Sequence, residues 1–540
     1  MQKLSLFVIL VLVFGCDSGA DPEMIDPPAA PPPGRTVQVT INLNEGRQPI
    51  SEYIYGSSQD IDNNDVWTVR RIGGNRMTGY NWENDYSNAG SDWMHSSDTY
   101  MLNLFGLSSG SNEPARVMTT FHEQSLAMGA QSLITLQLAG YVSADQAGNV
   151  SDNQTAPSSR WKRVELTKGA PFSAMPDRTD DVVYIDEFVQ YMVDKYGGAD
   201  SPQGVRWYAM DNEPGLWSET HPRIHPEHIN AADLVDRSIE MALAIKAVDP
   251  NAKVTGPALY GFGAYETLQG APDWAQEQRG QWFIDYYLDR MREAEETHGM
   301  RLLDVLDVHW YPEAQGDNRI VFGDALTEND IAARLQAPRT LWDPTYVENS
   351  WIGEWKQAFL PLLPTLQTSI ETYYPGTALG ITEYNYGAAG SISGGLAQVD
   401  VLGVFGEEGV DLATLWKLDD NSPYISSAFR LYRNYDGQLN TYGDTRVDVT
   451  LGDKEENSVY ASIHGDDAST LHIMAVNKSR TESASFVFDL DGDATFSDAD
   501  AYFINATSPV IQSESGITVG ANNQLTYTVP AMTAVHFVVK

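Results

Sequence analysis

The sequence is poor in cysteine and in basic residues. Cys16 is the only cysteine among 540 residues, so the chain cannot form an internal disulfide. Lys and Arg number 34 against 74 Asp and Glu, which gives a net charge of −40. Because nucleic acids and anionic lipids are bound mainly through Lys and Arg, we exclude nucleic acid as a partner. A neutral polymer such as a polysaccharide is compatible with this charge, which otherwise favours solubility.

Apolar runs long enough to cross a bilayer are also lacking. Residues 4–15 are apolar but too short to span a membrane comfortably, which predicts an export signal over residues 1–16. Cys16 follows directly and resembles the lipidated cysteine of a bacterial lipoprotein box, although Phe14 stands where a small residue is usual. Residues 17–35 predict a proline-rich, extended linker. We expect an exported lipoprotein at the cell surface or outer membrane, touching the membrane only through its anchor, or otherwise a secreted protein.

A glycine-rich phosphate loop is missing as well. The nearest candidate, "RIGGNR" (71–76), has two adjacent glycines and does not fit the nucleotide-binding pattern. Eight apolar strand-like runs instead alternate with helical stretches such as the amphipathic segment 228–250, which ends at Pro250. The eight runs are 53–59, 68–76, 132–140, 204–214, 253–260, 305–312, 378–387 and 412–418. This order predicts an α/β fold, a (β/α)8 TIM-like barrel over residues 45–424.

The pattern changes after residue 425. Short runs of alternating apolar and polar residues, separated by turn residues, predict an all-β sandwich over 425–540. The alternating segment 36–44 has no obvious partner in the barrel, so we assign it to the same sandwich. The chain is therefore expected to form two domains. The sandwich is expected to contain segments from both ends of the chain, one before and one after the barrel in the sequence.

Polar and aromatic side chains stand at the C-terminal ends of the predicted barrel strands, where barrel active sites lie. They are Asn212 and Glu213 on the fourth strand, His309 and Tyr311 on the sixth, Glu383 and Tyr384 on the seventh, and Trp416 after the eighth. Two carboxylates facing each other across a cleft are what cleavage of a glycosidic bond requires. His309 and Tyr311 alternate with Trp310, so both are expected on one side of their strand, as helpers to the nucleophile.

Several motifs together resemble glycoside hydrolase family 44. They are "RIGGNRMTGYNWENDYSNAGSDW" (71–93), "WYAMDNEP" (207–214), "THPRIHP" (220–226), "DVHWYPE" (307–313) and "ITEYNYG" (381–387). The resemblance extends from about residue 36 to the end. It implies an endo-acting β-1,4-glucanase or xyloglucanase with a barrel and a β-sandwich, working with retention of configuration. No cofactor is then required and a monomer is expected; a structural calcium ion is left open.

The resemblance also assigns roles to single residues. Glu213 matches the general acid/base and Glu383 the nucleophile, while Asn212 matches the amide that binds the sugar 2-hydroxyl. Trp351, Trp355 and Trp416 match aromatic residues that stack on glucosyl rings. From the residues alone, Glu213 could instead cap a helix or pair with an arginine, and Glu383 could form a buried salt bridge. The two tryptophans 351 and 355 could form one buried helix face.

Other functions stay open at this point. The enzyme could be a mannanase or a xylanase, or the protein could bind glycans at a surface without cleaving them. The histidines of "HPRIHPEH" (221–228) suggest a metal hydrolase, but the prolines argue against a helix that would gather them. The acidic residues of "DLDGDATFSDAD" (489–500) have spacings reminiscent of a calcium loop, but its glycine is at the fourth place, Ala494 is at the sixth and the last ligand is Asp. We interpret the segment as an acidic hairpin turn and leave calcium as an alternative.

Overall fold

The structure is a computed structural model that describes residues 34–58, 66–322, 325–418 and 421–540. The predicted export signal, Cys16 and nearly all of the predicted linker lie outside the described residues. No helix in the described part of the chain is both long and apolar enough to span a membrane.

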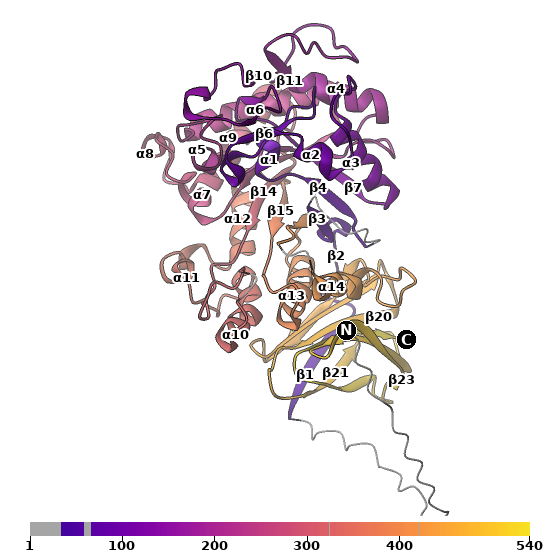
Figure 1. The fold of residues 1–540 in the computed structure, drawn as a ribbon. Helices are drawn as coiled ribbons and strands as arrows, with labels where there is room; N and C mark the ends of the chain where they lie inside the picture. The colour runs from indigo at the N-terminus through magenta and orange to yellow at the C-terminus, as the bar shows by residue number, and fades with distance from the viewer. Residues whose placement is uncertain (1–33, 59–65, 323–324, 419–420) are drawn as a thin grey trace, which may run out of the picture.

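Eight parallel strands close into a barrel. Seven of them lie inside the predicted runs, and the remaining one, β7, begins one residue before its run. In order around the barrel they are β3 (Gly56–Ser58), β4 (Val69–Ile72), β7 (Gln131–Leu136), β12 (Trp207–Met210), β13 (Lys253–Leu259), β14 (Val305–Trp310), β15 (Ala378–Tyr384) and β16 (Leu412–Leu415). The predicted (β/α)8 barrel with an additional β-sandwich is confirmed. Figure 1 shows the barrel above and the sandwich below.

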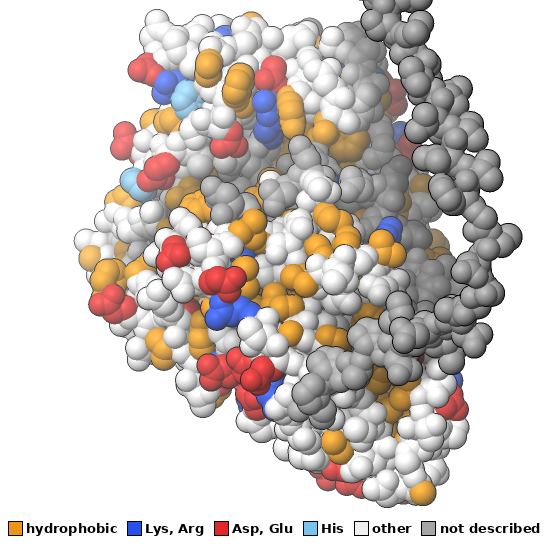
Figure 2. Space-filling model, turned by 60° about the horizontal axis from the view of Figure 1, so that its bottom comes forward, with side chains coloured by type: hydrophobic (Ala, Val, Ile, Leu, Met, Phe, Trp, Pro, Cys, Tyr) orange, Lys and Arg blue, Asp and Glu red, His pale blue; other side chains and the backbone are white. Residues whose placement is uncertain are grey.

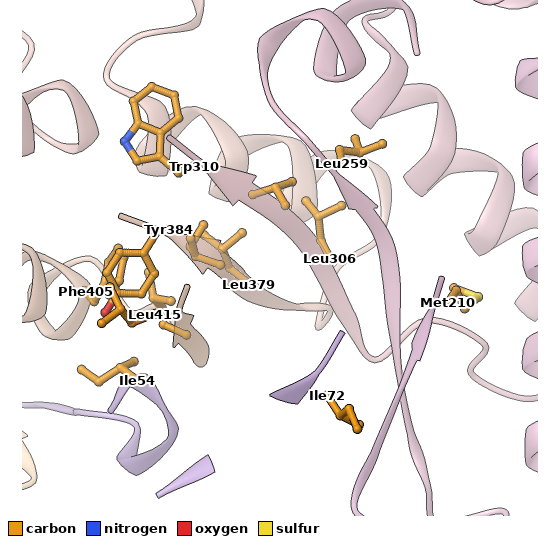
Figure 3. Packing of buried hydrophobic residues seen from close by; sticks show 14 of the residues in the cluster. Ile54, Ile72, Met210, Leu259, Leu306, Trp310, Leu379, Tyr384, Phe405 and Leu415 are labelled. Carbon is orange, nitrogen blue, oxygen red and sulfur yellow. The ribbon is translucent and has the colours of Figure 1, made fainter. Parts of the chain in front are cut away.

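Long helices surround the barrel. They are α3 (Arg116–Ala127), α4 (Ile185–Tyr196), α6 (Ala231–Val248), α9 (Phe283–His298), α12 (Leu362–Tyr373), α13 (Ile392–Glu407) and α14 (Pro423–Arg433). Strand side chains such as Ile72, Leu306 and Leu379 belong to the buried cluster under these helices (Figure 3). Burial of such side chains contributes about 1.5–3 kcal/mol each.

Several polar side chains in the barrel interior hydrogen-bond to one another. Thr382 donates to the buried carboxylate of Asp307 at 2.7 Å, and Ser58 lies 3.3 Å from the hydroxyl of Thr414. Buried polar groups are tolerated when they are hydrogen-bonded. These side chains form the floor beneath the C-terminal strand ends.

The β-sandwich contains segments from both sides of the barrel in sequence. One sheet has the order β18 (Asp448–Leu451), β1 (Arg35–Asn42), β21 (Ala484–Asp491) and β24 (Gln524–Val529). The other has the order β2 (Gln48–Pro49), β17 (Thr445–Arg446), β19 (Asn457–His464), β20 (Asp467–Asn477), β25 (Thr533–Val539), β22 (Asp498–Asn505) and β23 (Ser508–Thr518). β1 pairs in parallel with β21 and antiparallel with β18.

Three details differ from the sequence analysis. Strand β2 lies in the range assigned to the barrel, which starts at residue 45, yet it pairs with β17 in the sandwich. Helix α14 crosses the predicted domain boundary at 424/425 and packs against β22 and β23. The acidic segment 489–500 is not a hairpin turn, because it joins β21 in one sheet to β22 in the other. Its carboxylates bind separate partners, since Asp489 accepts from Gln524 and Asp500 from Lys540.

Helix α13 lies between the barrel and the sandwich. Asp400 on this helix accepts a hydrogen bond from Tyr460 at 2.5 Å and forms an ion pair with Lys478 at 3.0 Å. Both charged side chains are only 2% exposed. A Cβ at Gly403 would lie 2.3 Å from the Tyr460 ring, so only glycine permits this approach. The two domains therefore share a closely packed interface.

Candidate active site

Two irregularities at the barrel mouth set the direction of the central side chains. In β15 the pairing with β14 shifts, so that Val308 faces Ile381 while His309 faces Glu383. Thr382 is the extra residue of this bulge, and a bulge re-aims the side chains that follow it. The side chain of Thr382 points into the barrel, where it donates to Asp307. Side chains of a regular strand alternate between its two faces, so without the bulge the next residue, Glu383, would point outward. The bulge instead directs Glu383 to the mouth.

The second irregularity supports Glu213. Ala258 lies at a pairing shift in β13 and has a φ of +53°. Its carbonyl accepts the backbone N–H of Glu213 at 3.0 Å. Glu213 has a φ of +46°, which is uncommon for a residue with a long side chain. Strained backbone of this kind clusters at functional sites, where the surrounding structure holds it.

Glu213, Glu383 and His309 meet at the centre of the mouth. One carboxylate oxygen of each glutamate and a ring nitrogen of His309 all lie within 4.8 Å of one another. Nδ1 of His309 lies 2.9 Å from Glu213 and 3.6 Å from Glu383. Tyr311 donates to Glu383 at 2.8 Å. The structure thus brings together four of the six side chains predicted from strands four, six and seven.

Arg71, which the sequence analysis did not single out, completes the site from β4. Its guanidinium donates to Glu383 at 2.7 Å and to the side-chain oxygen of Asn212 at 2.9 Å. Arg71 is fully buried. A Cβ at Gly73 would lie 2.3 Å from this guanidinium, which explains the first glycine of "RIGGNR". The planar fork of arginine suits two partners at once.

The pKa values of the two glutamates move in opposite directions. Burial raises the pKa of Glu213, although the hydrogen bond from His309 opposes this. The pKa of Glu383 is lowered despite burial, because the charges of His309 and Arg71 and the hydrogen bonds from Arg71 and Tyr311 stabilise its ionised form. Two carboxyl groups whose environments separate their pKa values are suited to acid and base roles.

The predicted aromatic contacts are found in different places. Trp351, on the short helix α11 (Trp351–Trp355), packs against Phe262 and borders a cavity of about 290 Å³ beside Tyr311. Trp355 is 67% exposed, so the two tryptophans do not form one buried helix face. Trp416 is partly exposed, and its ring occupies the space where Gly74 would carry a Cβ, 2.4 Å away.

Tyr384 does not face the mouth. It is fully buried, packs against Phe405 of α13 and accepts a hydrogen bond from Gln398, as Figure 3 shows for Tyr384 and Phe405. Because the bulge turns Glu383 inward, its neighbour must point outward. The expectation that Tyr384 contacts a ligand is therefore corrected.

Trp93 is an exposed aromatic residue that the sequence analysis missed. It is 62% exposed and follows Asp92, which accepts from Asn75 at 3.1 Å. Asn75 in turn accepts from Asn212 at 3.3 Å. The signal in the sequence was the motif 71–93 itself, which ends on this tryptophan.

The histidine-rich segment does not assemble a metal site. His221 is buried beside Thr220, and Nδ1 of His225 lies 2.6 Å from the carbonyl of Glu227. Across the described ranges, the one group of three or more close metal-ligand side chains is Glu213, His309 and Glu383. The metal-hydrolase interpretation through residues 221–228 is therefore wrong.

Comparison with known proteins agrees with this geometry. Residues 86–314 match the model of glycoside hydrolase family 44. Endoglucanase A of Paenibacillus lautus is 51% identical over 507 residues, which cover 93% of this chain and 72% of that protein. The chain belongs to glycoside hydrolase family 44. Enzymes of this family are retaining glycosidases.

Solved structures of family 44 share the whole architecture. An endoglucanase from Clostridium thermocellum is 54% identical, with a TM-score of 0.92, and the match covers 94% of this chain and all of that one. A xyloglucanase from Paenibacillus polymyxa is 49% identical with the same TM-score and coverage. The protein is accordingly a glycoside hydrolase with the complete two-domain fold of the family.

Proposed function

We propose that this family 44 enzyme cleaves the backbones of β-1,4-glucans, namely cellulose-like chains and xyloglucan, at internal positions. Glu213 is the general acid/base and Glu383 the nucleophile. The observation that supports these roles is the distance of less than 4.8 Å between oxygens of the two carboxylates. Retaining glycosidases place their carboxyl groups roughly 5–5.5 Å apart, whereas inverting enzymes need room for a water molecule between them.

In the first step, Glu383 attacks the anomeric carbon while Glu213 protonates the leaving oxygen. Arg71 and Tyr311 keep Glu383 ionised before the attack, and Asn212, held by Arg71, is placed to bind the sugar beside the reacting carbon. The product of this step is a covalent glycosyl-enzyme. Glu213, now ionised, then removes a proton from the water that releases the sugar from Glu383.

Aromatic rings near the mouth support a glucan chain as substrate. Trp351 and Trp355 lie on α11 between β14 and β15, and Trp416 directly follows β16, so all three follow barrel strands and can offer apolar faces to pyranose rings. The chain carries 74 acidic against 34 basic residues, and Figure 2 shows charged side chains of both signs scattered among uncharged ones on one face of the molecule, which suits an uncharged polymer. The names of relatives, an endoglucanase and a xyloglucanase, point to the same substrates.

The cellular location and cofactor requirement belong to the proposal too. We expect a lipoprotein anchored through Cys16 or, failing that, a secreted enzyme that works as a monomer. No cofactor enters the two chemical steps. A chelator should therefore leave turnover unchanged, unless a structural calcium ion supports the fold, in which case thermal stability will fall as well.

The test is the release of reducing ends from xyloglucan, carboxymethyl cellulose, mannan and xylan by the soluble protein. Glu383→Gln and Glu213→Gln serve as paired variants, and Glu371→Gln on the outer helix α12 is the control. Activity on the β-1,4-glucans that is lost in both site variants supports the proposal. Activity confined to mannan or xylan would replace the substrate, and polysaccharide binding without new ends would replace the reaction.

A further inference from the structure

Asp211, immediately before the two proposed site residues, is the centre of a buried hydrogen-bond network. Its carboxylate accepts from the hydroxyl of Thr78 at 2.6 Å and from the backbone N–H groups of Leu138, Ala139 and Asn212 at 2.5, 3.0 and 2.8 Å. The side chain is fully buried. Burial raises the pKa of this carboxyl, whereas the four bonds, all from neutral donors, favour its ionised form.

These donors come from three adjacent parts of the barrel. Thr78 ends the short helix α1 (Asn75–Thr78) that follows β4, while Leu138 and Ala139 follow β7. Asn212 follows β12. The strand order around the barrel is β4, β7, β12, so Asp211 joins the C-terminal ends of three neighbouring strands. β4 carries Arg71, the partner of Glu383 and Asn212.

The backbone at this point needs such support. Asp211 has a φ of +62° and Glu213 a φ of +46°, both in the left-handed region. Aspartate tolerates this region because its short side chain bonds to nearby backbone groups, whereas a glutamate side chain offers no such compensation. The segment is further held where Trp217 donates to the carbonyl of Asn212 at 3.0 Å and where Glu213 donates to Ala258.

We propose that Asp211 is the positioning residue for Glu213. Its carboxylate holds Asp211 in the left-handed conformation and fixes the turn through Asn212 to Glu213, which aims Glu213 at Glu383. Asp211 touches neither the substrate nor the reacting atoms, and it acts only through the placement of Glu213. The inference rests on the proposed role of Glu213 as acid/base, and the experiment below separates the two.

The leaving group of the substrate distinguishes a misplaced acid from a damaged fold. A glucan needs Glu213 to protonate its leaving oxygen, whereas 2,4-dinitrophenyl β-cellobioside leaves without that proton. General acid catalysis contributes about 10²–10⁴-fold. With Asp211→Asn, which presents an N–H₂ group to N–H donors, kcat/KM on the glucan should fall by at least about tenfold. The value on the dinitrophenyl substrate should stay nearly unchanged.

Azide gives a second readout. It can replace the water that Glu213 activates in the second step, because it needs no general base. Azide should therefore raise kcat of Asp211→Asn on the dinitrophenyl substrate and yield β-cellobiosyl azide, without accelerating the parent enzyme. Glu213→Ala is the reference and should show the same pattern more strongly. If Glu213→Ala lacks that pattern, the proposed role of Glu213 fails, whatever Asp211→Asn does.

Thr78 supplies matched variants that change one donor. Thr78→Val keeps the side-chain shape and removes the hydroxyl, so it should show the same selective loss on the glucan in a smaller degree. Thr78→Ser keeps the hydroxyl and should restore the parent values. Circular dichroism melting checks that each variant is folded. The inference would be overturned if a folded variant lost kcat/KM equally on both substrates. It would also be overturned if Thr78→Val and Asp211→Asn both kept the parent kcat/KM on the glucan.

Discussion

Single side chains explain how one site can hold an acid and a base. The pKa of Glu213 is raised above the ordinary glutamate value of 4.5 by burial, and the pKa of Glu383 is lowered below it by His309 and Arg71. Activity requires Glu383 ionised and Glu213 protonated. We therefore predict a bell-shaped dependence of kcat/KM on pH, with the acidic limb below 4.5 and the alkaline limb above it. A profile with one limb would contradict this assignment.

His309 should set the position of both limbs. Its hydrogen bond lowers the pKa of Glu213 and its charge lowers the pKa of Glu383. Removing it in His309→Ala should therefore move both limbs to higher pH. His464→Asn, an exposed histidine of the sandwich, is the control and should leave the profile in place. A lower plateau without any displacement of the limbs would show that His309 only shapes the cleft.

Arg71 should be irreplaceable by lysine. Two nitrogens of the planar Arg71 guanidinium donate separately to Glu383 and to Asn212. The single ammonium group of a lysine cannot reproduce this planar pair of donors. Charge-assisted hydrogen bonds contribute about 1.5–3 kcal/mol, so Arg71→Lys should lower kcat/KM by roughly 10- to 100-fold. Arg70→Lys is the matched control, since Arg70 donates to Ser125 of α3 outside the barrel. Similar losses in both variants would argue for a purely structural effect.

The sequence predicts part of this site and not the rest. Glu213, Glu383, Asn212, His309 and Tyr311 could be placed because they follow apolar runs, where parallel strands end. Arg71 lies inside the run "VRRI", and nothing local tells which of two adjacent arginines faces inward. Tyr384 was misplaced because an unseen bulge changes the alternation.

Secondary-structure elements with strong patterns were predicted well. All eight barrel strands carry apolar runs, and the helix predicted over 228–250 is α6. Two small sheets in the loops after β4 and β7 were not predicted. One contains β5 (Ser87–Asn88), β6 (Ser96–Asp98) and β9 (Gly148–Asn149), and the other β8 (Tyr141–Ser143), β10 (Trp161–Glu165) and β11 (Val182–Tyr184). Their strands have two to five residues and pair across long loops, so their sequences carry little periodicity.

Helix α13 offers a test of how the two domains are joined. Lys478→Met would leave the buried carboxylate of Asp400 without its cation, which should lower the free energy of unfolding by about 3–5 kcal/mol. The exposed pair Arg480–Glu328 also joins sandwich and barrel, so Arg480→Met is the control and should cost less than about 1 kcal/mol. Urea unfolding measures both. Equal small effects would mean that the buried pair adds nothing to the interface.

The molecule as a whole should lose stability in acid through buried histidines. Burial lowers the pKa of His536 to about 3 and of His221 to about 4, against 6.5 when exposed. As pH falls below 6.5, the unfolded chain binds protons that the native protein cannot, so the free energy of unfolding decreases by about 1.4 kcal/mol per pH unit for each histidine.

His536→Asn isolates this effect in the sandwich. His536 lies 2.8 Å from the carbonyl of Leu431 and 3.0 Å from His472, where an amide can keep one bond. The variant should be less stable at pH 7, but its stability should fall less steeply between pH 6.5 and 4 than that of the parent. Urea unfolding across this range checks it, and parallel slopes would contradict the prediction.

The place of β1 in the sandwich has a consequence for biosynthesis. This strand leaves the ribosome before any barrel strand, yet both of its neighbours, β18 and β21, are made only after residue 447. Until then Val37, Val39 and Ile41 have no sheet to cover them. If the barrel closes as soon as β16 has been made, β1 is at that moment a strand whose two edges are both unpaired. A shortened enzyme built from the barrel alone would have to lose β1 together with the C-terminal strands.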